Sequence, residues 1–157
     1  MLCYRRDGLK GDNNMNAYTE LRNRHQERVN ALPIMWAFSM DQFRKEMERM
    51  GVTDKSEIVS IGNGGYMRKE EAPLLDKTFE AIDAEMKAAI EADTDGTGFI
   101  KDMFLYELAN HEYCITYDLE PTLDACGLTE AEVLNNTRLL NGLKLATKEY
   151  LRNSENY

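Results

Sequence analysis

The sequence predicts an α+β fold that is mainly helical. Apolar residues recur at three- and four-residue steps through most of the chain, which is typical of amphipathic helices. The segment IKDMFLYELA, residues 100–109, is apolar on nearly every side, which indicates a buried helix. In EIVSIGNGGYMRK, residues 57–69, β-favouring residues flank Asn63-Gly64, a pair suited to a type I′ turn. We therefore expect four or five helices packed around a central helix at about 100–111, with a small antiparallel β-hairpin at about 57–69.

The first helix is predicted from Asn16 to Pro33. One stripe of it carries apolar and aromatic residues together with a single histidine, and we interpret that histidine as a core residue with a satisfied hydrogen bond. The stripe consists of Tyr18, Leu21, His25, Val29 and Leu32. The apolar run IMWAF, residues 34–38, follows and is a candidate buried strand beside the hairpin.

Later helices are recognised from their caps and stripes. Ser39 and Gln42 have capping-box spacing, and Gly51 is suited to end the helix that they begin. The most regular stripe predicts a helix of about five turns before the central helix. It consists of Leu75, Phe79, Ile82, Met86 and Ile90. Shorter patterns predict a helix over 118–127, a second capping box at Thr129 and Glu132, and a C-terminal helix over 140–151.

The chain is expected to form a single globular domain at 15–153. Residues 1–14 show no periodicity, and Lys10-Gly11-Asp12 could be encoded by a ribosome-binding sequence just upstream of Met15. We therefore expect residues 1–14 to be a disordered or misassigned leader. A chain of 157 residues is long enough to bury one hydrophobic core.

The composition indicates the cellular compartment in which we expect the protein. No apolar run approaches the ~18 residues of a membrane-spanning helix, and the N-terminus lacks the pattern of a signal peptide. Three cysteines, Cys3, Cys114 and Cys126, show no paired spacing, so we expect free thiols in a reducing cytoplasm. No cofactor and no membrane contact are implied.

Negative charge is concentrated in the middle of the chain. The net charge is -9, and residues 70–132 hold 17 acidic and 3 basic side chains. Such a block disfavours direct binding to nucleic acid and favours a basic protein partner, for which a nucleic-acid-binding protein is one candidate. The simpler interpretation is a solubilising surface. The acidic residues that we expect to bind a partner are Asp76, Glu80, Asp83 and Glu91.

The loop DTDGTGFIKDMF, residues 93–104, begins like a calcium-binding EF-hand. Asp93, Asp95 and Thr97 occupy the first three ligand positions, and Gly98 takes the usual glycine position. The twelfth position, which needs a bidentate glutamate, is Phe104. We therefore expect an ordinary loop between two helices, with no metal site, and keep the three residues only as weak candidates.

Reactive residue types gather in NHEYCITYD, residues 110–118. The candidates for catalysis are His111, Glu112, Cys114 and Asp118. The zinc-protease pattern H-E-x-x-H fails because Ile115 stands where the second histidine would be. The simpler interpretation is that Asn110 and His111 satisfy backbone groups at a helix end and that Cys114 packs as a small apolar residue.

From about Met15 to Lys148 the chain resembles an uncharacterised family of small cytosolic proteins from Gram-positive gut bacteria and their mobile elements. Three segments carry the resemblance: NAYTELRNRHQERVNALPIMWAFS, EIVSIGNGGYMRK and TGFIKDMFLYELANHEYCITYDLEPTLDACGL. The resemblance implies an accessory gene of a phage, plasmid or conjugative element. It brings no activity, cofactor or catalytic residue.

Two functional classes follow. The first is a small acidic cytosolic accessory protein that acts by non-enzymatic interaction with a protein partner. The alternative is a small enzyme or ligand-binding domain that uses Asn110, His111, Glu112 and Asp118. The exposure and convergence of those four side chains distinguish the two classes.

Overall fold

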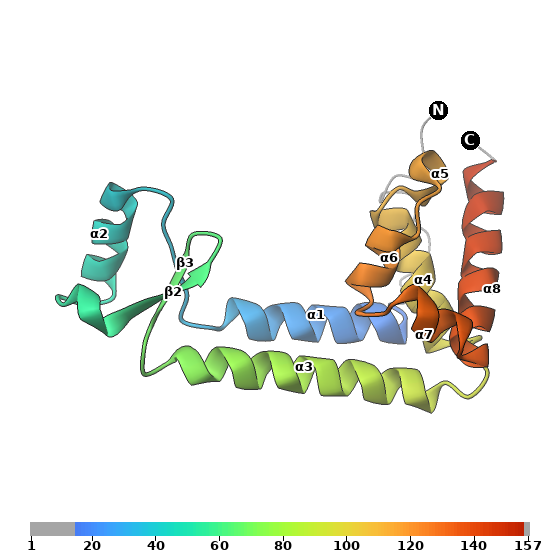
Figure 1. Ribbon diagram of the computed structural model, residues 1–157, viewed down its shortest axis with the longest axis horizontal. Coiled ribbons are helices and arrows are strands. Elements are labelled where there is room, and N and C mark those ends of the chain that lie inside the picture. Colours follow the sequence, from blue (N-terminus) through green and yellow to red (C-terminus); the bar gives the residue numbers. More distant parts are fainter. Residues whose placement is uncertain (1–14, 156–157) are drawn as a thin grey trace. The chain divides into compact units, whose positions relative to one another are not determined.

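The computed structural model describes residues 15–155, so the expected leader at 1–14 lies outside the described residues. Within them the chain forms eight α-helices and three β-strands, which confirms a mainly helical α+β fold (Figure 1). The chain divides into two compact units. We call Arg24–Glu85 the sheet unit, and the residues up to Asn23 together with those from Met86 onward the helical unit.

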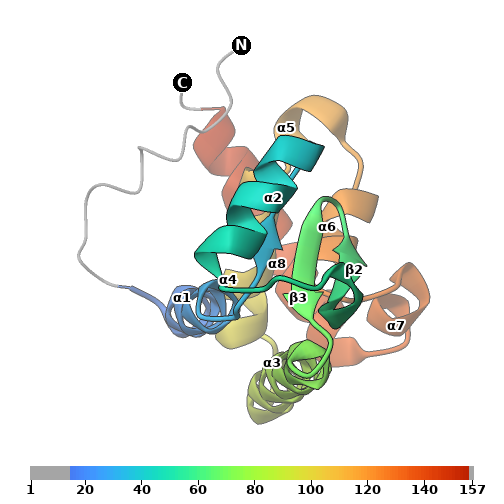
Figure 2. The ribbon, with the colours of Figure 1, turned by 90° about the vertical axis from the view of Figure 1, so that its left-hand side faces the viewer.

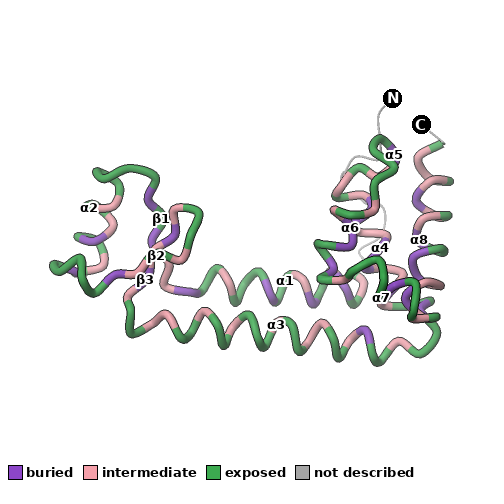
Figure 3. The backbone as a smooth tube through the Cα atoms, viewed as in Figure 1, coloured by how far each residue is buried: buried purple, intermediate pink, exposed green. Residues whose placement is uncertain are grey.

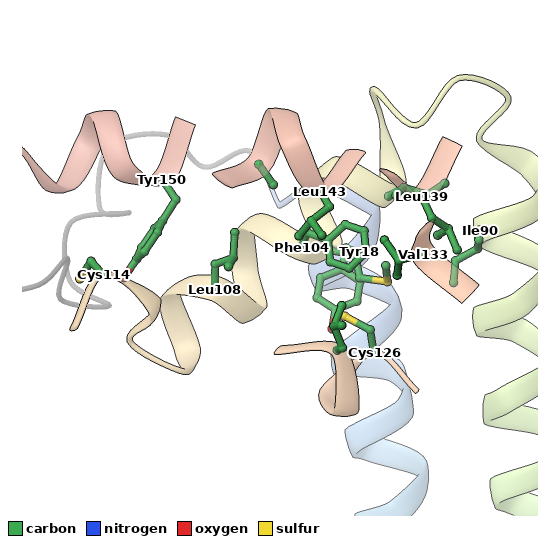
Figure 4. Packing of buried hydrophobic residues seen from close by; sticks show 14 residues of the cluster. Tyr18, Ile90, Phe104, Leu108, Cys114, Cys126, Val133, Leu139, Leu143 and Tyr150 are labelled. Atoms are coloured by element: carbon green, nitrogen blue, oxygen red, sulfur yellow. Dashed lines mark hydrogen bonds between the residues drawn. The ribbon is translucent and has the colours of Figure 1, made fainter. Parts of the chain in front are cut away.

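Helix α4 (Phe99–Asn110) is the centre of the helical unit. Its side chains Ile100, Met103, Phe104 and Leu108 are fully buried, which confirms the predicted central helix. It packs against α8 (Thr137–Ser154), α6 (Glu120–Ala125) and α5 (Tyr113–Thr116). Figure 4 shows Tyr18, Phe104 and Leu143, which α1, α4 and α8 contribute to this core. Helix α7 (Glu130–Leu134) begins at the predicted capping box of Thr129 and Glu132.

The sheet unit contains three antiparallel strands in the order β1-β3-β2. Strands β2 (Ile58–Gly62) and β3 (Gly65–Arg68) form the predicted hairpin, and β1 (Met35–Trp36) adds the third strand. Asn63 and Gly64 have φ values of 50° and 79°, as a type I′ turn requires. Helix α2 (Met40–Arg49), shown with β2 and β3 in Figure 2, begins where the hydroxyl of Ser39 accepts from the Gln42 amide. Met35, Met47, Val52 and Ile58 form a small core here.

The boundary between the units falls inside two helices, α1 (Ala17–Asn30) and α3 (Ala72–Ala92). The predicted stripe of α1 is confirmed, since Tyr18, Leu21 and His25 are buried. In α3 the stripe behaves differently along its length. Ile90 is buried in the helical unit, whereas Phe79 in the sheet unit is 46% exposed. Figure 3 shows that most of α3 is exposed or of intermediate burial. None of the described helices has the length and apolar character needed to cross a bilayer.

Candidate functional site

Glu107 is a buried carboxylate on the core face of α4, with 2% of its surface exposed. The Tyr18 hydroxyl donates a 2.6 Å hydrogen bond to Oε1 of Glu107, and Nε of Arg22 lies 3.4 Å from the same oxygen. A buried carboxylate is tolerated only when it is paired and hydrogen-bonded. Tyr18 and Arg22 both come from the first turns of α1, so the carboxylate joins α1 to α4.

Aromatic rings surround this contact. A guanidinium nitrogen of Arg22 donates a 2.9 Å hydrogen bond to the hydroxyl of Tyr106, and the guanidinium carbon lies 4.7 Å from the centre of that ring. The Tyr18 ring packs edge-on against Tyr106 and Phe99. Burial, and then the bond to Glu107, raise the pKa of Tyr18 far above its ordinary value. The hydroxyl therefore stays protonated and remains a donor.

The second oxygen of Glu107 is held less firmly. Nδ2 of Asn110 donates to Oε2 at 3.4 Å, and Nε2 of His111 lies 3.5 Å from Oε2. That contact does not meet hydrogen-bond geometry, so the buried Nε2 has no hydrogen-bond partner. Two of the sequence-predicted residues, Asn110 and His111, thus meet at Glu107.

The other predicted catalytic residues do not join them. Glu112 is exposed and has a φ of 51°, and the exposed Asp118 accepts a hydrogen bond from the Glu120 amide at the start of α6. Cys114 is buried, and its sulfur accepts from the hydroxyl of Tyr150 at 3.2 Å (Figure 4). Asn110, His111, Glu112 and Asp118 therefore do not form one convergent set.

The expectation of free thiols is wrong for Cys114, which is disulfide-bonded. Cys126 is a free cysteine, as expected, but it is buried. Burial, and then the nearby charge of Glu107, raise the pKa of the Cys126 thiol. A thiol in that state is a poor nucleophile, because the thiolate is the reactive form. Neither residue is suited to nucleophilic catalysis.

The acidic loop before α4 uses its carboxylates internally. Oδ1 of Asp93 accepts from the Gly96 amide, and Oδ2 accepts from the amides of Gly98 and Ile100 at 3.1 and 2.9 Å. Asp95 accepts from the amide and hydroxyl of Thr97, bonds that lower the pKa of Asp95. These bonds satisfy backbone donors at the start of α4. Among the described residues, no group of three or more His, Cys, Asp or Glu could hold a metal ion.

Arg138 of α8 binds the residues where α3 ends and the same loop begins. One of its guanidinium nitrogens donates to the carbonyls of Glu91 and Asp93 at 3.0 and 3.1 Å. The other lies 3.2 Å from both carboxylate oxygens of Glu91. Arg138 therefore satisfies free carbonyls at the C-terminal end of α3. Glu91, which we expected to bind a partner, pairs with Arg138, while its side chain stays 72% exposed.

Asp76, Glu80 and Asp83 lie on the part of α3 that belongs to the sheet unit. All three are exposed. Steps of four and three residues place them along one side of the helix. Within the described residues none of them forms an ion pair or a hydrogen bond. They differ in this from Glu91, which pairs with Arg138.

Glu85 links α3 to α1 inside the sheet unit. Oε1 of Glu85 lies 2.6 Å from a guanidinium nitrogen of Arg28, and Oε2 lies 3.1 Å from Nε2 of His25. The hydrogen bonds from Arg28 and then His25 lower the pKa of Glu85. His25 is buried and hydrogen-bonded, which confirms its interpretation as a core histidine.

Exposed apolar side chains gather where β1 leads into α2. Trp36, Phe38 and Met40 are 54%, 76% and 56% exposed, whereas Met35 and Ala37 between them are buried. The run 34–38 is therefore only half-buried, because a strand at the edge of a sheet turns alternate side chains outward. We call Trp36, Phe38 and Met40 the aromatic edge.

Residues 17–149 match a family of unknown function (DUF7659). The chain belongs to the DUF7659 family. No curated protein and no solved structure matches this chain.

The DUF7659 match runs through both units and includes Glu107 and the aromatic edge. Sequence reasoning missed both features. Glu107 could have been noticed as a lone carboxylate on the core stripe of α4, one turn after Met103 and Phe104. The alternation of Met35 and Ala37 with Trp36 and Phe38 is the signal for the aromatic edge.

Proposed function

We propose that the protein acts by non-enzymatic interaction with a protein partner in the cytoplasm, as an accessory protein of a mobile element. The observation that carries the proposal is the aromatic edge of the sheet unit. Trp36, Phe38 and Met40 are more than half exposed within a stretch of five residues. Tryptophan, phenylalanine and methionine are enriched at the centres of protein interfaces.

The backbone around the aromatic edge is well ordered for binding. The Phe38 amide donates a 2.7 Å hydrogen bond to the side-chain oxygen of Gln42, and the Ala37 amide donates to the carbonyl of Gly64. Strand β1 pairs with β3 on one side and has no strand on its other side within the described residues. A partner that covers the aromatic edge would meet a surface that is already formed, which lowers the entropy lost on binding.

Asp76, Glu80 and Asp83 support a basic partner. Their exposed, unpaired carboxylates attract a basic surface over about 8–10 Å at ordinary ionic strength. A nucleic-acid-binding protein offers such a surface, so it is the class of partner that we propose. Direct contact with nucleic acid is disfavoured by the same charges.

The alternative, a small enzyme or ligand-binding domain, requires Asn110, His111, Glu112 and Asp118 to act together. Asn110 and His111 contact Glu107, whose first oxygen is already occupied by Tyr18 and Arg22. Glu112 and Asp118 lie on exposed turns beyond α4 and contribute to neither contact. This arrangement favours interaction over catalysis.

Capture of partners from the native host tests the proposal. The wild-type protein and the double variant Trp36→Ala/Phe38→Ala are each used as bait, and bound proteins are identified by mass spectrometry. Ile115→Ala/Leu134→Ala is the matched control, because these apolar residues are also exposed but belong to the helical unit. We expect the control to retain a specific partner that the aromatic-edge variant loses. Recovery of the same partner by both variants would rule out the aromatic edge as its binding site.

The mobile-element context has its own test. The genes on either side of this one are compared in several strains. Regular proximity to integrase, relaxase or phage genes is expected, and a fixed position among housekeeping genes would contradict it.

A further inference from the structure

The first half of α3 carries an apolar stripe that lies outside both hydrophobic clusters. The stripe consists of Leu75, Phe79 and Ile82, which we call the α3 stripe; Phe79 is exposed, and Leu75 and Ile82 are half-buried. Neither of the two hydrophobic clusters includes any of them. The same pattern continues into the helical unit, where Met86 packs against the core and Ile90 is buried.

The spacing of the α3 stripe is that of a helix built for packing. Leu75, Phe79 and Ile82 follow steps of four and three residues, the a and d positions of a heptad pattern. A helix in water covers such a stripe with another element. Phe79, at 46% exposed, is the most exposed member of the α3 stripe and lies at its centre.

Charge differs between the two sides of the α3 stripe. With about 100° of rotation per residue, Asp76 and Asp83 follow the stripe on one side, whereas Glu85 lies on the other. Glu85 binds Arg28 of α1, so the arginines of α1 lie on that other side. Arg24 is one turn before Arg28, is exposed, and forms no ion pair within the described residues. Glu85 and Arg28 neutralise each other, so Arg24 gives that side its net positive charge. We call the side with Asp76 and Asp83 the acidic margin and the side with Arg24 the basic margin.

We propose that the α3 stripe binds the α3 stripe of a second copy of this chain. A two-fold axis running along the helix makes the two α3 helices parallel and places the acidic margin of each copy against the basic margin of the other. A two-fold axis across the helix would instead place acidic margin against acidic margin. Charge complementarity thus selects both the occupant and its direction. The basic groups that meet Asp76 and Asp83 are then the arginines of the second copy.

This dimer goes beyond the proposed function, because its apolar contact is the α3 stripe and not the aromatic edge, although both proposals use the carboxylates of Asp76 and Asp83. Sedimentation equilibrium of the full chain measures it, over concentrations up to about 100 μM. We expect the wild type to approach twice its mass of 18.1 kDa. Phe79→Glu should be monomeric, because it puts a charge into the centre of the contact. A wild type that stays monomeric throughout this range would overturn the proposal, even if the α3 stripe captures another protein.

Ala84→Glu is the matched control. Ala84 is exposed on the same helix. It stands five positions after Phe79, which places it about 140° away around the helix. The control should remain dimeric, with an unchanged circular dichroism spectrum. Phe79→Glu should lose the dimer but retain the helical circular dichroism spectrum. Loss of the dimer in Ala84→Glu, or its survival in Phe79→Glu, would contradict docking through the α3 stripe.

Charge exchange tests the parallel arrangement. Asp76→Arg/Asp83→Arg leaves basic groups on both margins. Arg24→Glu replaces the arginine of the basic margin and so leaves acidic groups on both margins. Each variant alone should dimerise more weakly than the wild type, by about tenfold or more in Kd. An equal mixture of the two should form a heterodimer, because opposite charges then meet on both sides. Absence of that heterodimer would refute the parallel pairing. Partner capture through the aromatic edge should be unchanged in Phe79→Glu, Ala84→Glu and Arg24→Glu, which alter none of the residues proposed to bind the partner. That result separates loss of the dimer from a failure of the proposed function.

Discussion

The hydroxyl of Tyr18 donates a 2.6 Å hydrogen bond to Oε1 of Glu107, although the two residues are 89 positions apart in the chain. This contact is buried and joins the first turn of α1 to the last turn of α4. Tyr18→Phe keeps the ring and removes the donor. We expect it to lower the free energy of unfolding by about 1.5–3 kcal/mol, because the acceptor is a buried carboxylate.

Urea unfolding of the wild type and Tyr18→Phe measures this loss. Tyr66→Phe is the control, since the Tyr66 hydroxyl forms no hydrogen bond within the described residues. In a Glu107→Leu background the same Tyr18→Phe change should have a much smaller effect, because the acceptor is gone. Equal effects in both backgrounds would show that the hydrogen bond does not stabilise the fold.

Gly64 has a φ of 79° and lies against Phe38. A Cβ at this position would come within 2.5 Å of a ring carbon of Phe38, and a β-branched residue resists positive φ. Gly64→Val should therefore destabilise the protein by about 1–3 kcal/mol. Thermal unfolding measures this change. Asn63→Gly is the control, because glycine adopts the φ of 50° at position 63 without strain. An unchanged melting temperature for Gly64→Val would contradict the assigned turn.

Asp93 accepts hydrogen bonds from the amides of Gly96, Gly98 and Ile100. Asp93→Ala should lower the free energy of unfolding by about 1–3 kcal/mol, because donors at the start of α4 lose their acceptor. Asp95→Ala should have a smaller effect, since the bonds of Asp95 reach only Thr97. Titration calorimetry should detect no calcium binding tighter than about millimolar, the weak end of the EF-hand range. Micromolar binding that disappears in Asp93→Ala would mean that the loop is a metal site.

Glu85 makes stability depend on pH. Arg28 and His25 hold its pKa below the ordinary glutamate value of about 4.3. A group whose pKa is lower in the folded state contributes stability above its unfolded pKa and loses that contribution as the pH falls through the folded value. Glu85→Gln should therefore be less stable than the wild type at pH 7, and the difference should shrink below about pH 4. Glu80→Gln is the control, because the exposed Glu80 forms no ion pair within the described residues. A difference that is independent of pH would show that the charge of Glu85 is not responsible.

The sequence predicts most elements of this fold because their signals are local. The capping box at Thr129 and Glu132, the Asn63-Gly64 turn and the stripe of α1 each depend on residues within a few positions of one another. The central helix was recognised from its own apolar composition. Burial was harder to predict, since it depends on what covers each face. The stripe of α3 is uniform in sequence, yet only its second half meets a core.

The candidate sites depended on distant contacts and were predicted less well. Nothing near Glu107 in the chain indicates Tyr18 or Arg22, because both partners lie about 85–90 residues earlier. The candidates His111, Glu112, Cys114 and Asp118 were grouped by sequence proximity. In the structure His111 lies against Glu107, Cys114 accepts from Tyr150, and Asp118 accepts from the Glu120 amide. Asp76, Glu80 and Asp83 are exposed as expected, and their binding role stays a prediction.

The contact between the loop before α4 and α8 restricts which substitutions this chain can accept. A Cβ on Gly96 would collide with the carbonyl oxygen of Arg138, and one on Gly142 would lie 2.5 Å from Cγ2 of Ile100. Both obstacles belong to the packed interior of the helical unit and cannot swing aside as a long surface side chain could. Random mutagenesis with selection for folded protein should therefore recover no substitution at either glycine, while Gly51 and Gly127, which have open space around them, accept asparagine. Sequence change where the loop before α4 contacts α8 is therefore expected at the residues around the two glycines and not at the glycines themselves.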